Sequence, residues 1–151
     1  MKGSLIVEIG KQVPALYFNY RNGIRITNPF LGLNISDLPE QSYFGDYQIL
    51  LGFSSQYDYT ATDEGHEHVH QTDNTWCMTI GAALFSNFCS MFPAFRSFLM
   101  NRGLQRRSFL RQTEENLIAT LNLQPENAKL QEAYATQYDQ LMKEKPYFIS
   151  N

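Results

Sequence analysis

The first sixty residues carry the alternation of apolar and polar positions that is typical of β-strands. Short runs rich in Ile, Val, Leu, Tyr and Phe occupy residues 4–9 and 15–20. In a third run, Ile24 and Ile26 fall on one side of the chain and Arg25 on the other. Asn22-Gly23 separates the second run from the third and tolerates the positive φ angles of a tight turn. The pattern predicts an antiparallel hairpin within a strand-rich part that covers about residues 4–61.

Two further strands are expected before residue 62. Residues 47–53 form an apolar run that indicates a buried strand, and residues 56–61 place Tyr57, Tyr59 and Ala61 on one side. Residues 62–75 are then polar and acidic and contain all the histidines, which is typical of a loop.

The period changes after residue 75, where a long apolar stretch begins that has no charged residue until Arg96. Residues 76–95 allow two interpretations: a buried central helix or helix pair, or a single membrane span with acids before it and arginines after it. Ser86, Asn87 and Pro93 interrupt the stretch and favour the buried helix.

Helical spacing continues through the rest of the chain. The tetrapeptide Arg-Ser-Phe-Leu occurs at 96–99 and again at 107–110, close to three helical turns later, so both copies should present the same face. Gly103 between them is expected to end or kink the helix, and the residues predicted to point inward next are Leu117, Ile118 and Leu121. A last helix should begin at Pro125 and end before Pro146, with an apolar stripe at Leu130, Tyr134, Tyr138 and Leu141. The sequence therefore predicts one α+β domain over residues 1–151, with strands over about 4–61 and helices over about 76–145.

Charge is distributed unevenly along a chain whose net charge is only −3. No Lys or Arg occurs between Ile26 and Phe95, whereas that stretch holds eight acidic residues. An arginine band without acids follows: Arg96, Arg102, Arg106, Arg107 and Arg111. An acidic middle and a basic band suit contacts between protein subunits, or ion pairs within one chain, and an acidic pI of about 5.6 argues against a nucleic-acid partner. We interpret the five arginines as an interface.

The cysteines and the start of the chain indicate a reducing environment. Cys77 and Cys89 are too few for a disulfide framework and lie in the most apolar stretch, where a free cysteine behaves as a small buried hydrophobe. The first residues lack the long apolar region of a signal peptide. The expected location is the cytoplasm or the inside of a virion or other complex.

The histidines form the only cluster that could carry chemistry, because all three lie in His66-Glu67-His68-Val69-His70. Imidazoles beside carboxylates suit zinc or a similar transition metal. On a strand, one metal could take adjacent histidines, whereas the outer pair would lie roughly 13 Å apart. On a helix, His66 and His70 would stand one turn apart.

The helical arrangement resembles the H-E-x-x-H motif of the zincin metallopeptidases. The resemblance implies that His66 and His70 bind zinc and that Glu67 is the general base. A third ligand could come from Glu114 or Glu115. The polar residues around the motif here differ from the apolar frame of that family, and an unliganded loop is the simpler interpretation.

No phosphate-binding glycine loop, G-x-S-x-G or Cys-x-x-Cys motif accompanies the cluster. Abundant Tyr and Phe together with Arg are the residues that interfaces favour. The sequence therefore favours a non-catalytic assembly or interaction protein, acting as an oligomer or as a subunit of a larger complex such as a virion or a secretion machine. A small zinc-dependent hydrolase and a single-span membrane protein are the alternatives.

Overall fold

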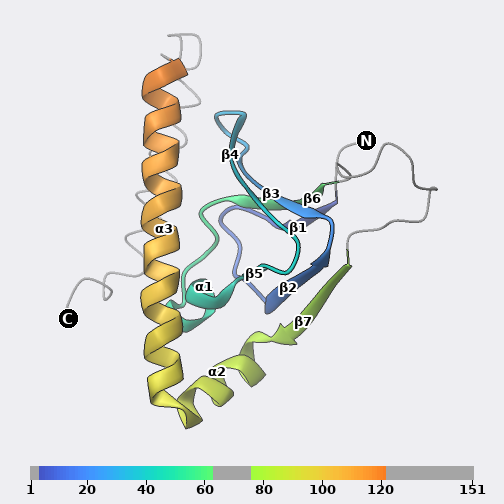
Figure 1. The fold of residues 1–151 in the computed structure, drawn as a ribbon, viewed down its shortest axis with the longest axis vertical. Coiled ribbons are helices and arrows are strands. Elements are labelled where there is room, and N and C mark those ends of the chain that lie inside the picture. Colours follow the sequence, from blue (N-terminus) through green and yellow to red (C-terminus); the bar gives the residue numbers. More distant parts are fainter. Residues whose placement is uncertain (1–3, 63–75, 122–151) are drawn as a thin grey trace.

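The computed structural model describes residues 4–62 and 76–121, which form two antiparallel sheets beside a long helix (Figure 1). The first sheet has the strand order β1 (Leu5–Val7), β6 (Asp58–Thr62), β3 (Gly23–Asn28) and β4 (Leu33–Leu38). The second has the order β5 (Tyr43–Phe44), β2 (Ala15–Arg21) and β7 (Trp76–Gly81). The helices are α1 (Asp46–Leu51), α2 (Ala82–Met91) and α3 (Pro93–Leu121). This confirms the predicted α+β class, with sheets in the N-terminal part and a long helix in the C-terminal half.

Residues from both sheets meet in one apolar core. Along β3 the side chains alternate as expected, since Ile24 and Ile26 are fully buried and Arg25 points outward. Phe44 stacks on Tyr17 with ring centroids 4.9 Å apart and on Tyr59 with centroids 4.7 Å apart. Because these rings come from β5, β2 and β6, the stack joins the two sheets.

The hairpin expected over residues 15–27 forms its turn but does not pair its strands. Asn22 adopts the left-handed conformation with φ 65°, as the Asn-Gly signal indicated. However, β2 pairs with β5 and β7, whereas β3 pairs with β4 and β6. The turn therefore passes the chain from one sheet to the other, and local turn chemistry does not determine which strand becomes the partner.

The buried strand expected over residues 47–53 is instead helix α1, so that prediction was wrong. Gly45 precedes the helix at φ 97°, and a Cβ there would stand 2.7 Å from the carbonyl oxygen of Ala15. Gly52 ends the helix in the left-handed region, and its N–H donates to the carbonyl of Ile49. A short apolar run does not distinguish a strand from a helix by periodicity, and here the flanking glycines fix the helix.

Residues 76–95 form neither the buried central helix or helix pair nor the single span considered for them. They divide into strand β7, helix α2 and the first residues of α3, and most side chains of α2 are exposed rather than buried. Among residues 4–62 and 76–121, no helix has both the length and the apolar character needed to cross a bilayer.

Helix α3 passes through Gly103 without a break, so the predicted end or kink is wrong. Gly103 is buried, and a Cβ there would overlap the Cβ of Tyr47 on α1. The glycine therefore permits a close helix–helix approach. The two Arg-Ser-Phe-Leu copies do present the same face, since Leu99 and Leu110 are both buried and Phe98 and Phe109 are both exposed. Leu121, expected to point inward, is exposed.

Two sequence predictions lie outside the described residues. These are the histidine cluster within residues 62–75 and the final helix over residues 125–145.

Both cysteines are free, Cys89 fully buried and Cys77 half-buried. Burial raises the pKa of each thiol, and Arg96 partly offsets the effect at Cys89. We expect Ellman's reagent at pH 8 to modify Cys77 slowly in the native protein and Cys89 only after denaturant is added. A Cys77→Ser variant should show no labelling until denaturant is added, and labelling of Cys89 in the native variant would contradict its burial.

Candidate functional site

The inward face of α3 carries charged residues among its apolar ones. Leu99, Gly103, Arg106, Leu110 and Glu114 are spaced by four, three, four and four residues, and together they form one stripe. Figure 1 shows α1 and the sheets on this side of α3. A charge on such a stripe needs a partner, so Arg106 and Glu114 require polar groups on the elements that α3 packs against.

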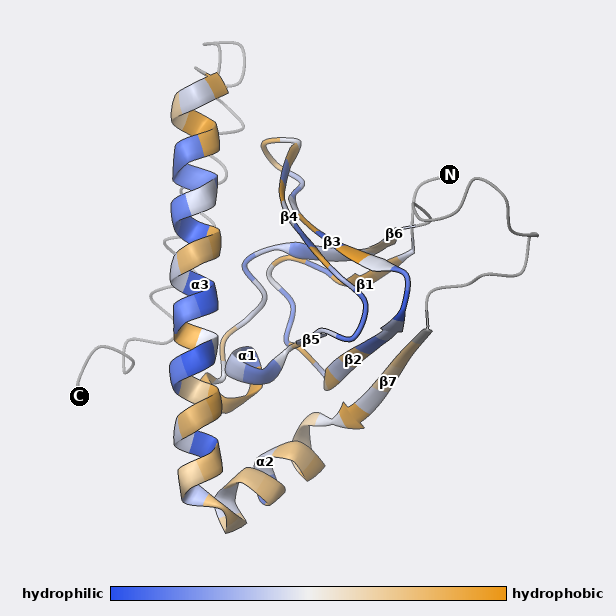
Figure 2. Cartoon of the chain, in the orientation of Figure 1, coloured by the Kyte–Doolittle hydropathy of each residue, from blue (hydrophilic) through white to orange (hydrophobic). Residues whose placement is uncertain are grey.

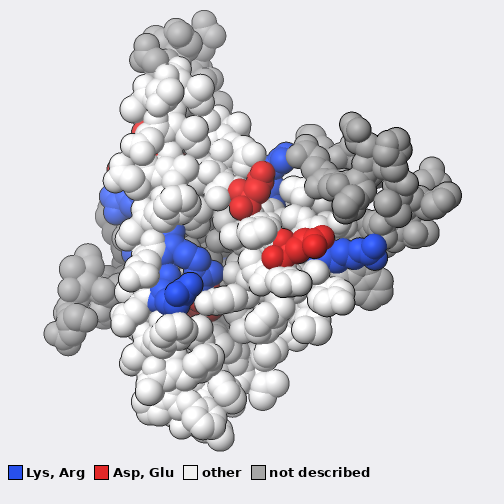
Figure 3. Space-filling model, in the orientation of Figure 1, with Lys and Arg blue, Asp and Glu red and all other residues white. Residues whose placement is uncertain are grey.

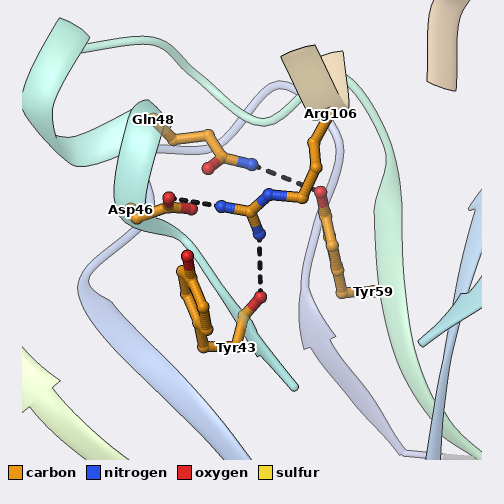
Figure 4. Close-up of polar contacts among 5 residues, drawn as sticks. All are labelled: Tyr43, Asp46, Gln48, Tyr59 and Arg106. Carbon is orange, nitrogen blue, oxygen red and sulfur yellow. Dashed lines mark hydrogen bonds and ion pairs between the residues drawn. The ribbon is translucent and has the colours of Figure 1, made fainter. Parts of the chain in front are cut away.

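Arg106 reaches from α3 to α1 and β5 (Figure 4). Its Nη2 donates to Asp46 Oδ2 in an ion pair, and its Nη1 donates to the carbonyl oxygen of Tyr43 at 3.0 Å. The guanidinium carbon also lies 4.7 Å from the centroid of the Tyr43 ring. The Asp46 side chain is 0% exposed and that of Arg106 is 32% exposed, so the pair is accessible only from the arginine side.

Burial dominates the electrostatics of Asp46. Desolvation raises the pKa of its carboxyl, and Arg106 and the backbone N–H groups of Tyr47 and Asp46 offset only part of that rise. Removal of Arg106 would therefore leave a buried carboxylate that takes up a proton more readily.

Two buried acceptors beside this pair have no hydrogen-bond partner among the described residues. They are Asp46 Oδ1 and Gln48 Oε1. The Gln48 amide nitrogen donates to the Tyr59 hydroxyl at 3.3 Å, as Figure 4 shows. Burial raises the pKa of Tyr59 to about 12 and that of Tyr47 well above its ordinary value, so both phenols remain neutral. The neighbourhood thus offers unused acceptors.

A small cavity of about 160 Å³ adjoins the ion pair. It lies between α3 and the two sheets, and its lining residues are Ile26, Ser36, Leu38, Phe44, Gly45, Asp46, Tyr47, Tyr59, Arg106, Phe109 and Leu110. Arg106 is the basic residue of this lining and Asp46 the acidic one. The cavity is smaller than the 300–1,000 Å³ or so that is typical of small-molecule sites.

Two further polar contacts hold α3 to the strand-rich part. Arg107 Nε donates to Gln56 Oε1 at 3.4 Å, and its guanidinium carbon lies 4.7 Å from the Phe53 ring centroid. Buried Glu114 accepts a 2.8 Å hydrogen bond from the amide nitrogen of Asn28 in β3. With Arg106, these contacts attach the middle of α3 at three levels.

The remaining arginines of the band lie nearer the surface. Arg102 is exposed and its guanidinium carbon stands 5.7 Å from the Phe98 ring centroid, while Arg111 pairs with Glu115 on its own helix at 3.3 Å. Arg96 is half-buried. The acidic middle and the basic band therefore meet within one chain at Asp46 and Arg106. The interface proposed for the band now rests mainly on Arg96 and Arg102.

An apolar cleft of about 560 Å³ lies on the other side of Asp46. Strands β2, β5 and β7 and helices α2 and α3 build it, and the lining residues are Leu16, Phe18, Tyr43, Asp46, Ile80, Leu84, Phe85, Phe88, Phe95, Phe98 and Leu99. Figure 2 shows that α2 and the first turns of α3 are mainly hydrophobic, and Figure 3 shows no charged atoms over this end of the visible face. Asp46 is thus shared between the cleft and the smaller cavity.

The predicted metal site cannot be placed, because His66, His68 and His70 lie outside the described residues. Within those residues, no group of three His, Cys, Asp or Glu side chains is arranged to hold a metal ion. Glu114, considered as a third ligand, is hydrogen-bonded to Asn28, and Glu115 pairs with Arg111.

Gln48 was missed as a site residue because residues 47–53 were interpreted as a strand, and Asp46, just before that run, was counted only among the acidic residues of the middle of the chain. The helical positions held a usable signal for Arg106. It falls on the same stripe as Leu99 and Leu110, and an arginine on an apolar stripe requires an acceptor.

Comparison with known proteins adds a likeness of fold. No protein-family model matches the chain, and no curated protein matches it significantly. Among solved structures, the cGMP-bound form of the EAL enzyme Bd1971 is similar at a TM-score of 0.51 and 15% identity, over 70% of this chain and 26% of that one. Its cAMP-bound form is similar at a TM-score of 0.49 and 14% identity, over 80% of this chain and 29% of that one. The chain therefore spans less than a third of the length of these neighbours, and the likeness to the cGMP-bound form shows a shared fold with part of a longer enzyme.

Proposed function

We propose that this chain is a non-catalytic regulatory domain of a larger assembly, which holds a small ligand under α3 and transmits its presence through that helix. One observation carries the proposal: Arg106 of α3 reaches into the small cavity and pairs there with Asp46. The proposal retains the assembly role expected from the sequence. It adds that one arginine of the band, Arg106, forms an ion pair within the chain.

The ion pair couples the cavity to the helix. A ligand that enters beside Asp46 must either bind both members of the pair or displace Arg106 from it. In either case the contacts that position α3 change. A ligand shifts such an equilibrium only by its difference in affinity for the two positions of the helix.

The polar groups define the chemistry of this ligand. Arg106 would bind an anionic group, and the unpartnered oxygens of Asp46 and Gln48 would accept hydrogen bonds from hydroxyl or amino groups. A cyclic nucleotide combines an anionic phosphate, a ribose hydroxyl and amino groups on its base. The cGMP that is bound to the similar EAL enzyme supports cyclic nucleotides as the first ligands to test.

The size of the cavity implies that α3 moves on binding. About 160 Å³ is too little for a nucleotide while Arg106 and Leu110 keep their positions. In the bound state, α3 would therefore be displaced from the sheets near Arg106. The parts of the helix before and after Arg106 would shift as well.

Titration calorimetry with cGMP and cAMP tests this function. We expect saturable binding that weakens at least tenfold in Asp46→Ala, because the hydroxyl groups lose their acceptor. Arg111→Ala, which removes an exposed arginine that pairs with Glu115 on the same helix, should bind as the unaltered protein does. Hydrogen exchange of α3 amides should change on saturation. No binding at millimolar nucleotide would overturn the ligand role.

A zinc hydrolase remains a second prediction, which rests on His66, Glu67 and His70 alone. Stoichiometric zinc that disappears in the His66→Ala, His70→Ala double variant would support it. Metal-free protein purified from zinc-supplemented medium would contradict it.

A further inference from the structure

The apolar cleft is lined by large side chains that remain substantially exposed. Leu84 is 67% exposed, Phe98 54%, Phe88 47% and Phe95 42%. They come from α2 and the first turns of α3 and surround one depression of about 560 Å³. A contiguous apolar surface of this kind marks a site of interaction rather than an ordinary solvated face.

Among the described residues, the charged side chains that flank the cleft are arginines, apart from buried Asp46. Arg102 lies against Phe98, Arg96 follows Phe95 directly, and the described residues 76–113 contain no acid. Asp46 lines the cleft but is buried and already paired with Arg106. Two copies of the chain that met through this face would bring arginines together, and the part of α2 and α3 that the structure describes there offers no exposed acid to compensate them. The charges favour a different partner, one with carboxylates.

The walls of the cleft also favour a helical partner over an extended one. The side chains that surround it are almost entirely apolar, and the backbone groups of α2 and α3 are largely used inside those helices. An extended segment could pair its backbone only along β7, the edge strand of its sheet among the described residues, and between α2 and α3 it would bury unpaired N–H and C=O groups. A helix satisfies its own backbone and offers only side chains.

We propose that this cleft binds an amphipathic helix with a stripe of large apolar side chains flanked by carboxylates, supplied by another part of the assembly. The apolar stripe lies between α2 and α3, and the carboxylates face Arg96 and Arg102. The inference does not depend on a ligand in the small cavity.

Peptide binding to the full chain tests this site. The probe is a synthetic 18-residue helix of Leu, Ala and Glu with leucines on one face, and its control has Lys in place of every Glu. We expect micromolar binding of the acidic peptide by fluorescence anisotropy and at least tenfold weaker binding of the basic one. The double variant Leu84→Ser, Phe98→Ser should bind the acidic peptide at least tenfold more weakly. Leu121→Ser, which alters an equally exposed apolar residue outside the cleft, should bind the acidic peptide with unchanged affinity.

A second variant keeps the test informative if the double variant fails to fold. Arg102→Glu changes one exposed side chain and should shift the preference toward the basic peptide. Equal binding of both peptides, or binding unchanged in the cleft variants, would overturn the proposal. Dimers in light scattering that dissociate in Leu84→Ser, Phe98→Ser would assign the face to a second copy instead. Binding to anionic vesicles rather than to the peptide would assign it to a membrane. Nucleotide titration of the same variants reports on the small cavity separately.

Discussion

Replacement of Arg106 by methionine is expected to lower the free energy of unfolding by about 3 kcal/mol, because it leaves the Asp46 carboxylate buried without its cation. This loss of unfolding free energy is at the lower end of the range for broken buried ion pairs, because Arg106 is one-third exposed and solvent screens part of the interaction. Urea unfolding followed by circular dichroism measures the loss. The double variant with Asp46→Asn should recover part of it, because the buried charge is removed as well.

The loss should depend on pH in a defined direction. Burial already raises the pKa of Asp46 above its ordinary 3.8, and removal of Arg106 raises it further. An acid whose pKa is higher in the folded state costs stability as the pH rises from its unfolded pKa through its folded pKa. The difference between the protein and Arg106→Met should therefore be greatest at neutral pH and should shrink toward pH 4.

Arg111→Met is the matched control for this pair, because it removes an exposed arginine paired within the same helix. It should cost less than about 1 kcal/mol. Equal losses for the two variants, or a loss in Arg106→Met that is the same at pH 4 and pH 7, would contradict the buried ion pair.

Gly103→Ala is expected to destabilise the protein by about 1–2 kcal/mol, although the same change in an exposed helix would stabilise it by about 1 kcal/mol. A Cβ at this position would overlap Tyr47 Cβ and stand 3.1 Å from Tyr47 Cγ. Helices α1 and α3 would have to separate, which is an overpacking cost of about 1–3 kcal/mol. Thermal unfolding measures the change.

Asn101→Ala is the control, since it lies two residues away on the exposed side of α3. Because alanine has a better helix propensity than asparagine, this change should leave the stability unchanged or slightly higher. A stabilised Gly103→Ala would mean that α1 and α3 do not meet at this position.

The helical character of α3 could be predicted from the sequence, because its apolar positions repeat with helical spacing and Leu99 and Leu110 are buried as that spacing requires, but its continuity through Gly103 could not. The strands β3 and β6 could also be predicted, because Ile24, Ile26, Tyr59 and Ala61 alternate with more polar residues. Local periodicity was sufficient wherever an element has one buried face.

The rest depends on contacts between distant residues. The pairing of β2 with β7 brings Leu16 opposite Ile80, and nothing near Asn22 indicates that partner. The site was out of reach for the same reason. Asp46 and Arg106 are far apart in sequence and meet only because Gly103 allows α3 to approach α1 closely. The uneven charge suggested that ion pairs could form within the chain, but it did not indicate which residues would meet.

Helix α3 extends well past the point at which the ion pair holds it. From Arg106 to Leu121 the helix is roughly 22 Å long at about 1.5 Å per residue. At the other end, Phe92 alone separates it from α2. A rotation of about 10° at the level of Arg106 would therefore move the far end by roughly 4 Å. Under the proposed function, α3 would act as a lever: once the Glu114–Asn28 hydrogen bond also yields, a side-chain rearrangement at Asp46 becomes a displacement of the Leu121 end of the helix.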